Sequence, residues 1–126
     1  MILIFGGAYQ GKLAYAMERF ALTEEQVYRC SAEDIGIPCD KRVIYGLDQW
    51  ILALVRADAD IVEQAGQFMK AKEDTIVICN DISCGVVPID DTLRKWREET
   101  GRVLAILSQR SEEVIRLFCG LPSQIK

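Results

Sequence analysis

The apolar positions of this chain alternate between short continuous runs and longer stretches with helical spacing. Short apolar runs that end at glycine or polar residues are typical of buried strands. Five such runs occur: MILIF at 1–5, QVYRCS at 26–31, RVIYGL at 42–47, TIVICND at 75–81 and EVIRLFCG at 113–120. They predict five strands, of which the β-branched run at 75–81 carries the clearest signal.

Helical spacing marks three other stretches. Residues 12–22 and 48–74 carry apolar residues at helical intervals, and the ADAD sequence at 57–60 is expected to divide the second stretch into two helices. Residues 90–110 allow two interpretations, because VLAIL at 103–107 also resembles a strand. The apolar stripe through this stretch and the capping Asp90 favour one helix.

Strands that alternate with helices predict an α/β fold, in which a mostly parallel sheet is flanked by helices on both faces. The loops are expected at 32–41 and 83–90, which contain glycine and proline, and LPSQIK at 121–126 is expected to be a tail. With 126 residues and no linker-like segment, we expect one domain over 1–126.

Composition narrows the possible functions. The net charge of −4 comes from interspersed charges, which argues against nucleic acid as a partner. No apolar run approaches the roughly 20 residues of a membrane span, and the five cysteines include no C-x-x-C pair. We therefore expect a cytoplasmic protein with reduced thiols and no structural metal. The chain contains no histidine, which excludes any mechanism that uses an imidazole.

The sequence GGAYQGKL at 6–13 stands between the first strand and the first helix. It follows the phosphate-binding pattern G-x-x-x-x-G-K, but Leu13 occupies the place of a hydroxyl that would hold Mg²⁺. The candidate nucleotide-binding residues are Gly6, Gly7, Ala8, Tyr9, Gln10, Gly11, Lys12 and Leu13. The alternative is an ordinary glycine-rich turn with a surface lysine.

Asn80 and Asp81 end the strand at 75–81. Ligands of parallel sheets bind at the carboxyl ends of the strands, so these side chains are candidates to face a phosphate or a metal-bound water. A simple turn or helix-cap pair is an equally good interpretation of the pattern. Lys12 and Asp81 are the candidate catalytic residues.

Three segments together resemble the bifunctional adenosylcobinamide kinase / adenosylcobinamide-phosphate guanylyltransferase family. They are MILIFGGAYQGK at the start, CNDISCGVVPIDDTLRKWREETGRV in the middle and LFCGLPSQIK at the end. The middle segment is similar to the family signature N-E-V-G-x-G-[V/I]-V-P, with Asp81 in place of glutamate and Ser83 in place of glycine. RVIYGLDQWIL also resembles the strand and helix L-L-D-C-L-T-L-W of the family.

The resemblance implies a three-layer P-loop fold of RecA type, a nucleotide (GTP or ATP) with Mg²⁺, a corrinoid acceptor and a homotrimer. It also implies two reactions, phosphorylation of the corrinoid and transfer of GMP through a guanylylated histidine.

This chain departs from that pattern. The segment that carries the histidine in the family is missing before RVIYGL, and Tyr45 aligns with the acidic residue expected on the third strand.

Three functional hypotheses remain open. The first is a degenerate member that binds nucleotide or corrinoid without guanylyltransferase activity. The second is a minimal active kinase, in which Asp81 orients Mg²⁺ or the acceptor hydroxyl. The third is a relative that serves only as a structural or partner-binding protein. Whether the chain is an enzyme is left undecided by its sequence.

Overall fold

A computed structural model describes residues 1–7, 11–38, 40–71, 74–82 and 90–126. The strands are β1 (Ile2–Gly6), β2 (Val27–Arg29), β3 (Val43–Tyr45), β4 (Ile76–Asn80), β5 (Glu113–Phe118) and β6 (Leu121–Gln124). The helices are α1 (Lys12–Arg19), α2 (Leu47–Arg56), α3 (Ile61–Ala71) and α4 (Asp91–Arg110), with a short 3₁₀ turn, η1, at Glu24–Gln26. The strands form one sheet in the order β2-β3-β4-β1-β5-β6.

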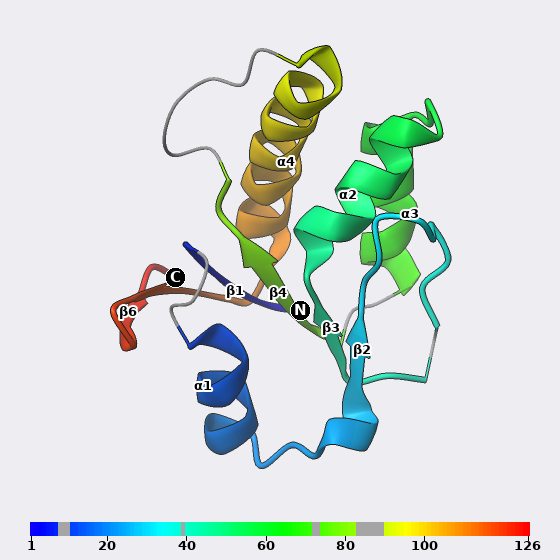
Figure 1. The fold of residues 1–126 in the computed structure, drawn as a ribbon. Coiled ribbons are helices and arrows are strands. Elements are labelled where there is room, and N and C mark those ends of the chain that lie inside the picture. Colours follow the sequence, from blue (N-terminus) through cyan, green and yellow to red (C-terminus); the bar gives the residue numbers. More distant parts are fainter. Residues whose placement is uncertain (8–10, 39, 72–73, 83–89) are drawn as a thin grey trace.

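Helices cover both faces of this sheet, as the sequence predicts (Figure 1). α2, α3 and α4 lie on one face and α1 lies on the other. Neighbouring residues of a strand point to opposite faces, so that Leu3 packs under α2–α4 while Ile4 packs under α1. The first five strands pair in parallel, and the central strands β1, β3 and β4 are buried on both faces, which explains their continuous apolar runs.

Two predictions about the helices are confirmed. The long stretch divides where ADAD occurs: α2 ends at Arg56 and α3 begins at Ile61, with Asp58 between them at φ 55°. Residues 91–110 form one helix, and the Asp90 side chain caps it by accepting a hydrogen bond of 3.0 Å from the Leu93 backbone N–H. The first helix, in contrast, is shorter than predicted, because it ends at Arg19.

The predicted tail is wrong, because residues 121–124 form the antiparallel edge strand β6. Cys119 and Gly120 connect β5 to β6 and both have positive φ, 51° and 76°. Two consecutive residues of this kind form the tight turn that matches the twist of a hairpin. Cys119 is consequently exposed in the turn. No helix in the described part of the chain is long and apolar enough to cross a membrane.

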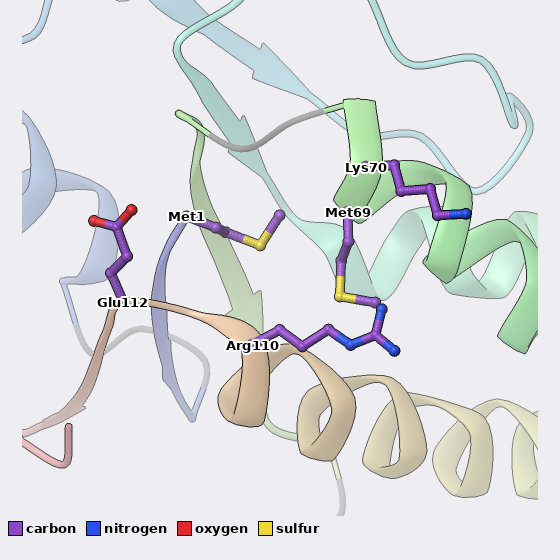
Figure 2. Close-up of a pocket in the computed structure, with 5 residues that line it drawn as sticks. All are labelled: Met1, Met69, Lys70, Arg110 and Glu112. Carbon is purple, nitrogen blue, oxygen red and sulfur yellow. The ribbon is translucent and has the colours of Figure 1, made fainter.

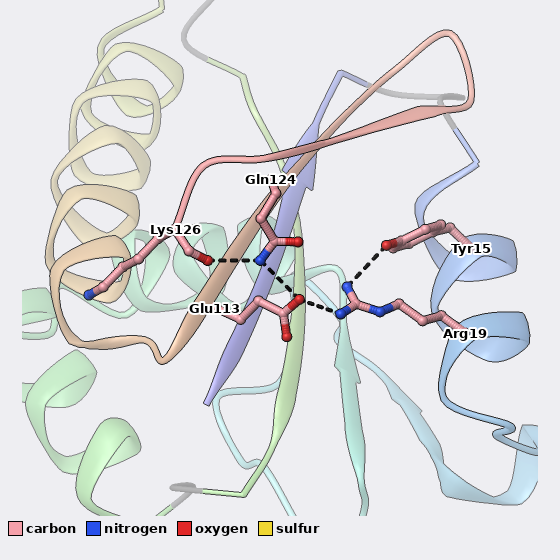
Figure 3. Close-up of polar contacts among 5 residues, drawn as sticks. All are labelled: Tyr15, Arg19, Glu113, Gln124 and Lys126. Carbon is pink, nitrogen blue, oxygen red and sulfur yellow. Dashed lines mark hydrogen bonds and ion pairs between the residues drawn. The ribbon is translucent and has the colours of Figure 1, made fainter.

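A polar network ties α1 to β5 and β6 (Figure 3). The Arg19 guanidinium donates hydrogen bonds to Glu113 and, at 3.1 Å, to the Tyr15 hydroxyl. The Gln124 amide donates to Glu113 at 3.0 Å and to the Lys126 carbonyl at 2.8 Å. Glu113 therefore links the hairpin of β5 and β6 to α1, which is far away in the sequence.

Glu113→Gln is expected to lower the free energy of unfolding at pH 7 by about 1 kcal/mol, as for a partly exposed ion pair. Burial alone would raise the pKa of Glu113, but hydrogen bonds from Gln124 and Arg19 outweigh it and hold the pKa below its usual value. The stabilisation is thus complete above the unfolded pKa of about 4.3 and is lost as the pH falls through the folded pKa. Urea unfolding at pH 7 and pH 3 measures this change, with the exposed Glu18→Gln as control. Parallel pH profiles of Glu113→Gln and wild type would contradict it.

Candidate phosphate-binding site

The carboxyl ends of β1, β3 and β4 meet at one edge of the sheet. β1 ends at Gly6, whose carbonyl accepts a hydrogen bond of 2.8 Å from the Asp81 backbone N–H. β3 is followed by Gly46, whose N–H donates to the Ile78 carbonyl at 2.9 Å. Backbone pairing therefore brings the glycine loop, the end of β4 and the start of α2 together, at the edge where parallel sheets bind ligands.

The start of α1 provides backbone donors at this edge. Gly11 precedes the helix with φ 77° and ψ 25°, a left-handed conformation that favours glycine. Within the described part of the chain no side chain caps the helix, and its first turn contains no acidic residue. The first N–H groups of α1 and the positive end of its dipole are thus available to an anion. Ala8, Tyr9 and Gln10 belong to the predicted site but lie outside the described residues.

Lys12 is a buried residue and not a surface lysine. It is 4% exposed, and its Nζ donates a hydrogen bond of 2.7 Å to the Gly7 carbonyl. Burial lowers the pKa of Lys12, while attraction to Asp48 and Cys79 acts in the opposite direction. A buried ammonium group needs anionic or polar partners, because removing its charge from water is unfavourable. The alternative of a surface lysine is therefore wrong, and phosphate binding by the loop stays a prediction.

Asp48 is a buried carboxylate that the sequence analysis missed. It lies in the first turn of α2 and is 1% exposed. Its Oδ1 accepts a hydrogen bond of 3.1 Å from the Asn80 backbone N–H, and its Oδ2 accepts one of 3.3 Å from Gln49 Nε2. The sequence feature that could have revealed Asp48 is an acidic residue two positions after Gly46, in a helix that begins at the carboxyl end of a strand.

Asn80 and Asp81 lie where the sequence places them, at the end of β4. Both are half-buried, and both use their backbone N–H groups to hold the edge together, Asn80 with Asp48 and Asp81 with Gly6. The two residues therefore have a structural role at this edge of the sheet. The Asp48 carboxylate thus lies against the end of β4, at the residue before Asp81.

Leu13 and Tyr45 occupy the two positions where the resemblance leads one to expect metal-binding groups. Both are half-buried and pack against the apolar cluster beneath α1, which includes Ile4, Ala16 and Ile78. The Tyr45 ring also lies 5.9 Å from the Arg29 guanidinium. These two side chains stabilise the core and offer no metal ligand at those positions.

The remaining carboxylate ligands fit only one kind of Mg²⁺ site. Among the described residues, no group of three or more acidic or cysteine side chains is arranged to hold a metal. Mg²⁺ is often bound by one or two carboxylates together with phosphate oxygens and waters. Asp48 and Asp81 fit a metal ion that enters with a phosphate ligand, and they do not fit an ion held by the protein alone.

A separate cavity of about 340 Å³ opens at the amino ends of the strands (Figure 2). Its lining residues are Met1, Met69, Lys70, Arg110 and Glu112. Lys70 lies in the last turn of α3 and Arg110 in that of α4, where cations offset the negative ends of the helix dipoles. This cavity is on the opposite edge of the sheet from Lys12 and takes no part in the candidate site.

The family model described as cobinamide kinase / cobinamide phosphate guanyltransferase matches residues 45–125, which is more than half of the chain. The match includes Asp48, Asn80 and Asp81, and it begins after the glycine loop and Lys12. No curated protein matches the chain significantly.

Proposed function

Because this chain belongs to the cobinamide kinase / cobinamide phosphate guanyltransferase family, we propose that it binds a nucleotide, GTP or ATP, through the loop from Gly6 to Leu13. One observation carries the proposal: the buried ammonium group of Lys12 lies against the loop, its Nζ bonded to the Gly7 carbonyl. A lysine that is withdrawn from water and lies at the start of a helix is suited to a polyanion.

The binding step follows from these groups. The N–H groups at the start of α1 donate hydrogen bonds to phosphate oxygens, and Lys12 exchanges its Gly7 carbonyl partner for a phosphate oxygen. Mg²⁺ would enter with the nucleotide, held by phosphates and water near Asp48 and Asp81, and would neutralise phosphate charge. The proposal includes no guanylyl transfer.

Incubation with GTP is expected to leave no acid-labile GMP on the protein. The covalent route needs an imidazole nucleophile, and the chain has no histidine. The measurement uses GTP labelled on its α-phosphate, followed by denaturing electrophoresis and mass spectrometry. A GMP adduct on any residue would contradict the proposal, and its site would identify another nucleophile.

Leu13→Ser is expected to tighten binding of the Mg²⁺-nucleotide by about 1–2 kcal/mol, the scale of a hydrogen bond to a charged group. Serine restores a hydroxyl at the start of α1, whereas leucine cannot bind a metal or its waters. The same change is expected to destabilise the fold by about 1–2 kcal/mol, because Leu13 packs against the apolar cluster beneath α1.

The measurement is a set of calorimetric titrations of wild type and Leu13→Ser with GTP and ATP, with and without Mg²⁺. Leu13→Ala is the control, since it loses the same packing but gains no hydroxyl. Equal affinities for all three proteins would show that this position does not act on the metal. No binding of either nucleotide by wild type, with or without Mg²⁺, would overturn the proposed function.

One observation favours a second candidate, the phosphorylation of a corrinoid such as cobinamide. The sequence indicates a single strand-end acid, Asp81, but the structure adds the buried carboxylate of Asp48, which accepts a hydrogen bond from the Asn80 backbone N–H. Phosphoryl transfer depends on metal ions that neutralise developing charge, so a second acid makes the reaction more feasible. The test is incubation with ATP or GTP, Mg²⁺ and cobinamide. Release of nucleoside diphosphate that depends on cobinamide would establish the kinase, and its absence would leave the binding function alone.

A further inference from the structure

One side-chain ion pair holds the far end of the helix that starts at the glycine loop. α1 begins at Lys12 and ends at Arg19, about 10 Å away along the helix axis at roughly 1.5 Å per residue. The Arg19 guanidinium donates a hydrogen bond to Glu113, which begins β5 and pairs in register with Ile2 at the start of β1. We propose that Glu113 is a positioning residue for phosphate binding: by holding Arg19, it aims the first N–H groups of α1 at the phosphates. This inference rests on the proposed binding of nucleotide at the loop.

Arg19 has a well-defined position at the end of α1. Its guanidinium donates a hydrogen bond of 3.1 Å to the Tyr15 hydroxyl, and its Cζ atom lies 4.9 Å from the centroid of the Phe20 ring. The side chains of Arg19 and Glu113 are 35% and 20% exposed, so water screens their attraction only in part. The end of α1 is therefore attached to one point on β5 (Figure 3).

The β6 strand holds Glu113 from the other side. The Gln124 amide donates a hydrogen bond of 3.0 Å to the same Glu113 oxygen, Oε1, that accepts from Arg19. The same amide donates to the Lys126 carbonyl at 2.8 Å. Because the hairpin of β5 and β6 fixes the carboxylate, a shift of α1 would break the bond to Arg19 and would not carry Glu113 with it.

The contacts along the rest of α1 are less directional. Leu13, Ala16 and Phe20 belong to the apolar cluster beneath the helix, and apolar packing does not favour one orientation strongly. Among the described residues no side chain caps the first turn, and the Lys12 Nζ bonds to Gly7, within the loop itself. The ion pair with Glu113 thus selects one tilt of α1 over the sheet, in the way that a polar contact can make a packing arrangement unique.

The test is calorimetric titration of wild type and Glu113→Gln with inorganic triphosphate and Mg²⁺ at pH 7. Glutamine keeps the size of the side chain and an acceptor oxygen, and it removes the charge that holds Arg19. We expect the affinity to fall about fivefold, the factor by which losing a partly exposed ion pair can lower the population of the aligned helix. Partial unfolding would not produce this loss, because a domain that loses one such pair stays almost entirely folded.

Amide NMR distinguishes positioning from a purely structural role. In ligand-free Glu113→Gln we expect the backbone amide signals of Lys12 and Leu13 to shift, although both residues lie at the opposite end of α1 from Arg19. An ion pair that only stabilised the fold would leave these signals unchanged. Arg19→Lys keeps the positive charge, and it is expected to retain part of the affinity that Arg19→Gln loses.

Glu24→Gln is the matched control. It removes the same charge from an ion pair with Arg29 that joins η1 to β2, outside α1. It is expected to bind triphosphate as wild type does. If Glu113→Gln fails to fold by circular dichroism, Arg19→Gln removes the other partner of the pair and replaces it in the comparison.

The outcomes separate this inference from the proposed function. If Lys12→Gln weakens triphosphate binding but Glu113→Gln binds as tightly as wild type, the loop binds phosphate and the inference about Glu113 is wrong. Unchanged amide signals, or an equal loss of affinity in Glu24→Gln, would also contradict the inference. If wild type binds no triphosphate with Mg²⁺, or binds it independently of Lys12, the proposed function fails and the inference fails with it.

Discussion

Gly6→Ala is expected to destabilise the fold by about 3 kcal/mol or more, the range reached by steric strain in a packed core. A Cβ atom on Gly6 would lie 2.4 Å from the Leu117 carbonyl oxygen of the neighbouring strand β5, and Gly6 has φ 155°. The obstacle is backbone, so relief requires β1 and β5 to separate. Because Gly6 also begins the loop, nucleotide affinity is expected to fall with stability. Urea unfolding and nucleotide titration measure the two effects.

Gly66→Ala is the matched control for Gly6→Ala. Gly66 lies inside α3, and an added Cβ meets nothing within 4 Å. Alanine is expected to stabilise that helix by about 0.5–1 kcal/mol, since it restricts the unfolded chain more than glycine does. Unfolding of Gly6→Ala at the same urea concentration as wild type would contradict the close approach of β1 to β5.

Lys12→Gln is expected to weaken nucleotide binding by about 1.5–3 kcal/mol, the contribution of a charge-assisted hydrogen bond. Glutamine keeps an N–H donor and loses the charge that a phosphate requires. The buried environment strengthens the effect, because water does not screen the ammonium group of Lys12. The measurement is calorimetric titration with GTP and ATP in the presence of Mg²⁺.

Lys70→Gln is the control for Lys12→Gln. It removes the same charge from an exposed position in the last turn of α3, at the opposite edge of the sheet. Its nucleotide affinity is expected to equal that of wild type. An unchanged affinity of Lys12→Gln would mean that the loop holds its ligand without the lysine, and it would contradict the observation on which the proposed function rests.

The pattern of apolar positions was enough to predict the five parallel strands, the division of residues 48–74 and the single helix after Asp90. Those features depend on local periodicity and capping, which a sequence carries directly. The glycine loop and Lys12 could also be recognised in the sequence, because their residues are contiguous. The strand β6 was missed because its formation depends on a hairpin turn in which the non-glycine Cys119 takes a positive φ.

The sequence by itself determined the parallel α/β fold, the family resemblance, the position of the loop and the absence of an imidazole nucleophile. Only the tertiary structure decided that Lys12 is buried, that Leu13 and Tyr45 pack against the core, and that Asp48 is buried against the end of β4. Asp48 bonds to the backbone of a residue 32 positions away. That contact arises because β3 pairs with β4 and β4 pairs with β1 in a fixed register. Such registers follow from packing across the whole sheet, and no local sequence pattern around residue 48 predicts them.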